Sequence, residues 1–163
     1  MHAPLAAEDN RLLRSIPAAR VALIERIARA APRGRNELRQ RFLRAYFHGV
    51  AEEDLAERTP RQLARAALTH LQFGAHRASG RSLVRVFNPQ SKGDGFESPH
   101  TLVLTVTDDM PFLVDSLGMA FGRAELAVHL IVHPVLIVRR DRRGQLLDIG
   151  TNGAEAARSL PPR

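Results

Sequence analysis

The chain has 163 residues, of which 44% are hydrophobic and none is cysteine. This length suits one domain, or one domain with a helical appendage. The absence of cysteine excludes disulfides, thiolate catalysis and cysteine-bound metal. No apolar run approaches the roughly 18 residues of a membrane span, and the N-terminus carries no signal-peptide pattern, so we expect a cytoplasmic protein without a membrane partner.

The net charge of +7 is confined to the N-terminal half, because residues 1–81 hold 15 arginines and 8 acidic residues, whereas residues 82–163 hold 9 basic and 9 acidic residues. Such a bias toward arginine commonly reflects the nucleotide composition of the genome. Arginines on helices could also follow a phosphate backbone, but no helix-turn-helix pattern is present and the aromatic residues belong to an apolar stripe. A solvated face, or a face docked on another domain, is therefore favoured over nucleic acid for Arg20, Arg26, Arg29, Arg33, Arg35, Arg39, Arg41 and Arg44.

Helical patterns occupy the N-terminal half. After a flexible lead-in (residues 1–14), the spacing of apolar residues predicts a basic helical region over 15–80, with helices at 15–31 and 36–48 and a short one at 51–57. Thr59, Pro60 and Gln62 then match a capping box with proline at the first helical position. The helix that they begin places Leu63, Ala67, Leu68 and Leu71 inward.

The period changes to that of strands after residue 80. A short strand is predicted at 83–87, a turn-rich loop at 88–99, and a buried strand at 101–107 that runs directly into a helix ending near residues 123–125. Residues 127–140 are predicted to be one long extended segment, in which Pro134 implies an edge position or a bulge. A hairpin-like turn at 141–144 leads to a short strand at 145–149, and the tail at 151–163 has the composition of a disordered segment.

The turn between the buried strand and the helix is the candidate site. Asp108 and Asp109 stop the strand, and either carboxylate can accept hydrogen bonds from the free N–H groups of the helix, with Pro111 in the first turn. Adjacent carboxylates diverge in an extended chain, so turn formation and capping are favoured over ligand contact, and an acid/base pair is not expected. The residues of this candidate effector or interface turn are Asp108, Asp109, Met110, Pro111, Phe112, Asp115 and Ser116.

The remaining motifs point to no chemistry. His129 and His133 share one face of the predicted extended segment, but about 13 Å separates them along it, too far for two ligands of one metal unless Pro134 bends the chain. Strand packing or surface exposure is favoured for both. There is no glycine-rich phosphate loop, G-x-S-x-G elbow or HExxH motif. We therefore predict no catalytic residue, no cofactor-binding residue and no metal ligand in this chain.

Four stretches carry a resemblance to a known family: RTPRQLARAALTHLQFG, LVRVFNP, SPHTLVLTVTDDMPFLVDSL and HLIVHPVLIVRRD. Their order and spacing resemble the N-terminal region of the large bacterial NAD-specific glutamate dehydrogenases, over residues 56–149. The resemblance implies an ACT-like module with a ferredoxin-like βαββαβ fold, usually associated with amino-acid sensing or subunit contact. It also implies that NAD and the dehydrogenase chemistry belong to a separate catalytic domain of the parent enzyme.

Two departures from the family pattern bear on function. ACT modules that bind amino acids usually have glycine after the proline of the turn, where this chain has Phe112. In addition, strand 145–149 is too short to be the third strand of the sheet, and the second helix and fourth strand are missing, although strand 83–87 is a candidate partner for the central strand. We therefore expect an α+β chain: a helical region, then a partial ACT-like sandwich at 81–150 that is incomplete at the C-terminus, as in a truncated N-terminal piece.

The resemblance favours a non-catalytic regulatory or scaffolding portion of a large NAD-dependent glutamate dehydrogenase, whose parent reaction is oxidative deamination of L-glutamate to 2-oxoglutarate in amino-acid catabolism. Its expected partners are other domains or subunits of the parent, with an amino-acid effector as a further candidate. The alternative is a small amino-acid-sensing or protein-interaction module that acts alone.

Overall fold

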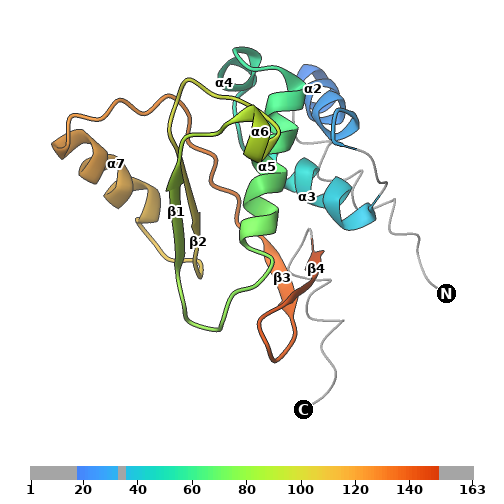
Figure 1. The fold of residues 1–163 in the computed structure, drawn as a ribbon, viewed down its shortest axis with the longest axis vertical. Helices are drawn as coiled ribbons and strands as arrows, with labels where there is room; N and C mark the ends of the chain where they lie inside the picture. Colours follow the sequence, from blue (N-terminus) through green and yellow to red (C-terminus); the bar gives the residue numbers. More distant parts are fainter. Residues whose placement is uncertain (1–17, 33–35, 151–163) are drawn as a thin grey trace.

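A computed structural model describes residues 18–32 and 36–150. The lead-in predicted at 1–14 and the tail predicted at 151–163 lie outside these ranges. Figure 1 shows helices at the N-terminal side, a β1–β2 sheet beside them, helix α7 on the far side of that sheet, and a β3–β4 hairpin below the helices. The α+β class is confirmed, with two small antiparallel sheets in place of one complete sheet.

Within the described residues, four helices form the N-terminal region, as the apolar spacing predicts. Their bounds are α2 Ala18–Arg29, α3 Glu37–Phe47, α4 Glu52–Ala56 and α5 Pro60–Phe73. The Asn36 side chain caps α3 by accepting a hydrogen bond from the Leu38 N–H. The predicted capping box of α5 is confirmed, because the Thr59 hydroxyl accepts from the Gln62 N–H and the Gln62 side chain accepts from the Thr59 N–H.

The main core lies among these helices and reaches the C-terminal hairpin. Its buried residues come from α2 to α5 and from β4 (Leu146–Gly150), whose Ile149 is buried within it. Leu130, Val132 and Leu136 pack against its edge. The helical region and the C-terminal half therefore share one apolar cluster.

Strand β1 (Leu83–Phe87) pairs antiparallel with β2 (Leu102–Val106), which confirms the predicted partner of the central strand. The alternation of the two faces is as predicted, but the description of the central strand as buried is wrong, because only Leu104 of β2 is buried. One face of this sheet remains open and carries Val84, Val86 and Val103. The predicted loop after β1 contains a four-residue helix, α6 Ser91–Asp94.

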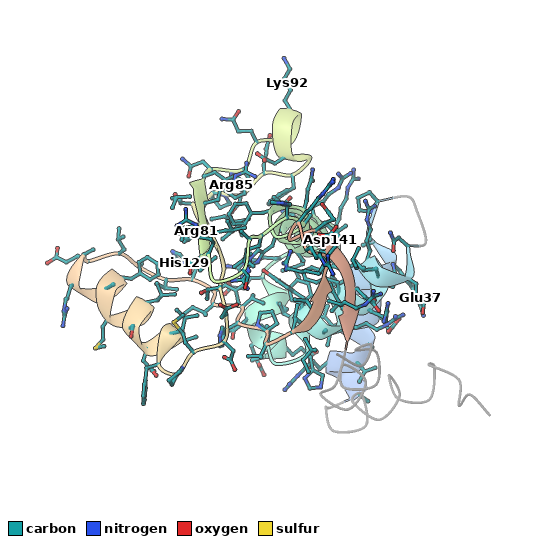
Figure 2. All side chains as sticks on the ribbon, turned by 90° about the horizontal axis from the view of Figure 1, so that it is seen from below. Glu37, Arg81, Arg85, Lys92, His129 and Asp141 are labelled. Carbon is teal, nitrogen blue, oxygen red and sulfur yellow. The ribbon has the colours of Figure 1, made fainter. Side chains whose placement is uncertain are left out.

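Helix α7 (Leu113–Arg123) ends where the sequence predicts, but the cap predicted at its start is wrong. Neither Asp108 nor Asp109 caps it: Phe112 is the N-cap residue, no side chain caps the helix, and Pro111 precedes it. Phe112 takes a left-handed backbone conformation with φ 60°, which carries the chain sharply from the turn into the helix. No residue of α7 is buried, and Figure 2 shows the helix projecting away from the rest of the molecule.

Only the last part of the predicted extended segment is a strand. Residues 137–140 form β3 (Ile137–Arg140), which pairs antiparallel with β4, whereas residues 127–136, which we term the linking segment, belong to no helix or strand. The predicted turn at 141–144 closes this hairpin: the Asp141 carboxylate accepts hydrogen bonds from the Arg143 and Gln145 N–H groups. No helix within the described ranges is long and apolar enough to cross a membrane.

Candidate functional site

A cavity of about 200 Å³ lies where the end of β2 meets α5 and the linking segment. Side chains of α3 and α5 form one wall, residues 105–109 a second, and residues 132–136 a third, with β3 and β4 at the base. Apolar residues such as Phe42, Leu71 and Val132 supply most of the wall. The polar side chains that line it are Tyr46, His70, Arg77, Thr105, Thr107, Asp108, Asp109, His133 and Arg140.

A hydrogen-bonded chain links two helices to β2 behind the cavity. The Nε2 of His70 lies 3.0 Å from the Thr105 carbonyl oxygen, and its Nδ1 lies 3.0 Å from the Tyr46 hydroxyl. Because a carbonyl only accepts, Nε2–H is the donor, and the neutral ring then accepts the Tyr46 hydroxyl proton at Nδ1. Burial lowers the pKa of His70, with the hydrogen bond to Thr105 opposing it, and burial raises the pKa of Tyr46. The neutral forms of both groups are therefore favoured.

Two arginines border the cavity, and both are engaged with protein acceptors. Arg77 pairs with the Asp108 carboxylate and donates to the Arg81 carbonyl oxygen. Arg140 donates to the carbonyl oxygens of Gly74, Ala75 and Gly144, at 2.7, 3.4 and 2.9 Å. Burial, and then the nearby charge of Arg77, lowers the pKa of Arg140. These guanidinium groups therefore fix the loop after α5 to the turn and to the hairpin.

The carboxylate of Asp109 differs from that of its neighbour. It lines the cavity, is exposed, and makes no hydrogen bond or ion pair with any other residue that the structure describes. Leu113, at the first turn of α7, lines the same cavity. The free N–H groups of this uncapped helix start and the Asp109 carboxylate are thus among the polar groups at the cavity that are open to a ligand, as is the exposed ring of His133.

The structure divides the predicted turn into two parts. Asp108 and Asp109 line the cavity. The other five residues lie outside its lining and are exposed: Met110, Pro111, Phe112, Asp115 and Ser116. Only the two aspartates are therefore placed to contact a ligand in the cavity, and the others lie on the outer surface of the turn and of α7.

Sequence reasoning missed Tyr46, His70, Arg77 and Arg140 as residues of this site. His70 interrupts an otherwise apolar helix face, and Tyr46 is the single tyrosine of the chain, so each offered a weak signal. The two arginines offered none, because they are two among many.

The two histidines considered as metal ligands do not belong to a cluster of metal-ligating side chains among the described residues. His129 stacks on His100, with ring centroids 4.1 Å apart, and His133 lines the cavity. Within the described ranges, no group of three or more His, Asp or Glu side chains is arranged to hold a metal ion.

Some arginines of the helical region link one element of the molecule to another. Arg41 donates to the Asp148 carboxylate at 2.7 Å and to the Ile149 carbonyl oxygen, which joins α3 to β4. Arg44 pairs with Glu25 at 2.6 Å and joins α3 to α2. Arg26, Arg29 and Arg39 are exposed. Arg33 and Arg35 lie outside the described residues.

Comparison with known proteins decides the family. A profile described as "Glutamate dehydrogenase, ACT1 domain" matches residues 42–161, well over half of the chain. The chain belongs to this family. The match starts within α3 and includes α5, both sheets and α7. The resemblance to glutamate dehydrogenase identified in the sequence is thereby confirmed.

Two relatives of this chain are named NAD-specific glutamate dehydrogenase. The protein from Halomonas elongata is 35% identical over 123 residues, which cover 73% of this chain and 8% of the relative. The protein from Pseudomonas aeruginosa is 31% identical over 114 residues, which cover 70% of this chain and 7% of the relative. The chain thus spans less than a tenth of the length of these relatives. No solved structure matches it.

Proposed function

We propose that this chain is a non-catalytic scaffolding or regulatory portion of a large NAD-dependent glutamate dehydrogenase, and that its main role is to dock on other domains or subunits of that enzyme. The parent reaction is oxidative deamination of L-glutamate to 2-oxoglutarate. Family membership supports the parent, and the distribution of apolar surface supports the docking role.

That distribution is uneven along the chain. Every large apolar residue that is exposed within the described ranges lies between Val84 and Leu147, and none lies in α2 to α5. Most of these residues lie on the open face of the β1–β2 sheet, on α7 and its preceding turn, and on residues 126–135, and two lie on the β3–β4 hairpin, Val138 and Leu147. Contiguous apolar surface on a folded chain marks an interaction site or a part of the molecule that another part covers.

Methionine oxidation tests the docking role directly. Met110 and Met119 are both exposed, Met119 by 57%, and belong to this surface. Dilute peroxide should therefore oxidise both readily in the isolated chain, whereas both should be protected in the full-length enzyme. Both methionines lie in one tryptic peptide, residues 93–123, so mass spectrometry of its fragment ions gives the two rates separately. Equal rates in the isolated chain and in the enzyme would contradict the proposal.

Amino-acid sensing is a second candidate function, and the geometry around Asp109 favours it. An amino acid could place its ammonium group against the Asp109 carboxylate and its carboxylate at the free N–H groups of α7, where the helix dipole favours negative charge. Phe112 stands where sensing modules of this kind usually carry glycine, which supports the docking role over this one.

Calorimetry with the common amino acids on full-length enzyme tests sensing. Binding that is lost in Asp109→Asn and kept in Asp115→Asn would support it, because Asp115 is exposed on α7 and does not line the cavity. If no amino acid gives heat that is lost in Asp109→Asn, sensing at this site is excluded.

The remaining assignments follow from the parent. We assign NAD binding and catalysis to parts of the parent outside these 163 residues, since the sequence holds no glycine-rich phosphate loop. The division into a helical region (15–80) and an ACT-like module (81–150) remains a proposal, as does a cytoplasmic location. Other domains or subunits are the proposed partners, and nucleic acid is not.

A further inference from the structure

The linking segment (residues 127–136) has the side-chain pattern of a β-strand. Its sequence, AVHLIVHPVL, is rich in β-branched and apolar residues and contains no charged side chain. From residue 130 to residue 136 the exposure alternates strictly: Leu130, Val132 and Leu136 face the core, and Ile131 and Val135 face outward. Period-two alternation is that of a strand with one face packed and the other open.

The backbone of this segment lacks the ladder that such a strand normally has. None of its N–H or C=O groups makes a hydrogen bond with another described residue, whereas the directly following residues of β3 pair with β4. Backbone groups in folded proteins are nearly always paired with one another or with water. A strand-like segment whose backbone is open is an unpaired edge, ready to accept another strand.

The segment is held in place without that partner. The stacking of His129 on His100 fixes its start beside the start of β2, and Leu130, Val132 and Leu136 anchor it to the core. Figure 1 shows it running from α7 across the molecule to β3. A backbone that is already ordered loses little conformational entropy when a second strand binds, which favours association.

From this geometry we infer that the linking segment is an acceptor edge for strand addition, and that its partner is an extended, uncharged, apolar strand from the parent polypeptide outside these 163 residues. This inference rests on the proposed function and names the contact by which docking occurs. Main-chain hydrogen bonds would supply affinity, and β-branched side chains opposite Ile131 and Val135 would supply the fit.

Two other occupants fit less well. Residues 151–163 continue from β4, but Leu160 is their single large apolar residue and Ala, Gly, Asn and Pro predominate, a composition that is poor in strands. A second copy of the chain must bind from bulk solution. A strand of the same polypeptide is present at a high effective concentration, and more than nine-tenths of the length of the relatives lies outside the matched region.

Hydrogen–deuterium exchange of the amides of residues 128–136, apart from Pro134, which has no N–H, tests the inference. In the isolated chain these amides should exchange at nearly the rate of an unstructured peptide, because they make no backbone hydrogen bond with any other described residue. In the full-length enzyme the amides that pair with the added strand, every second one along the segment, should exchange at least about tenfold more slowly, as paired amides do. Ile131→Pro in the enzyme, which removes one ladder donor, should abolish that protection, whereas Ile131→Val should preserve it.

Each other outcome overturns the inference in a distinguishable way. Equal, fast exchange in the enzyme and in the isolated chain would exclude strand addition, and continued protection of Met110 and Met119 would show that the proposed docking role survives. Slow exchange in the isolated chain at every concentration would identify residues 151–163 as the occupant. Protection that grows with the concentration of the isolated chain would identify a second copy.

Discussion

Phe112 combines an unfavourable backbone with a side chain that contributes little. Its φ of 60° lies in the left-handed region, where a Cβ costs about 1–2 kcal/mol. Its ring is 74% exposed, so little apolar burial offsets that cost. This is also the position at which ACT modules that bind amino acids usually carry glycine. The chain therefore keeps a glycine-like conformation without the glycine.

Replacing Phe112 should relieve this strain. We expect Phe112→Gly to be more stable to urea than Phe112→Ala by about 1 kcal/mol, because both variants remove the ring and only glycine accepts the positive φ without a steric cost. The comparison with alanine is the control for loss of the side chain. Equal stability of the two variants would show that the turn relaxes to another conformation.

His70 should make stability depend on pH. The pKa of His70 in the folded chain lies below its ordinary value because of burial. As the pH falls toward and below about 6.5, the unfolded chain therefore binds more protons than the folded chain does. The free energy of unfolding should therefore decrease from pH 7.5 to pH 5.5. Urea titrations at both values should show a smaller decrease for His70→Gln, and an unchanged pH dependence in that variant would contradict the assignment.

At the scale of single residues, the sequence predicts local hydrogen bonds and misses distant ones. The capping box of Thr59 and Gln62 is readable because donor and acceptor lie three residues apart with fixed geometry. The same reasoning predicted that the Asp108 side chain could cap α7, and it does not. Its carboxylate pairs instead with Arg77, 31 positions away, and only the folded chain brings the two together.

At the scale of elements, the C-terminal hairpin is tied to the helices by β4. Ile149 is 1% exposed within the helical core, and Arg41 of α3 donates to its carbonyl oxygen. Leu147, two residues earlier in the same strand, is 45% exposed. The two side chains therefore separate the contribution of core packing from that of the strand itself.

Truncating these two residues should have very different costs. We expect Ile149→Ala to lower the free energy of unfolding by about 2–5 kcal/mol, as for other large-to-small changes in cores, and Leu147→Ala to change it by well under 1 kcal/mol. Urea unfolding followed by circular dichroism measures both. Similar effects would mean that the hairpin does not belong to the helical core.

Element type was predictable where apolar periodicity was long, and less so where a strand needed a partner. The helices at 18–29, 37–47 and 60–73 follow from a repeating apolar stripe, and the last of them also from its capping box. Over residues 130–136 the alternation is present in the structure, but no described residue supplies the ladder that would make the segment a strand. Periodicity reports which side chains face a core, whereas pairing depends on a second chain segment.

At the scale of the whole molecule, burial is unequal between its two sides. The helices and β4 enclose the main core, whereas α7 contributes no buried residue and the outer face of the β1–β2 sheet is open. Elements with few buried contacts open at a lower free energy than the core does. The chain alone should therefore unfold in more than one step, although its length is typical of cooperative domains.

The composition allows these steps to be observed separately. Tyr46 is the single tyrosine and there is no tryptophan, so intrinsic fluorescence reports the helical core. Because there is no cysteine, a dye attached to the variant Ser116→Cys would report α7 alone. We expect the dye to change at a lower urea concentration than Tyr46 does in the same labelled chain. The unlabelled chain controls for any effect of the dye on the Tyr46 transition. In full-length enzyme, contacts that cover α7 should raise the midpoint of the dye toward that of the core. Coincident transitions in the isolated chain would instead show that α7 is coupled to the core despite its exposure.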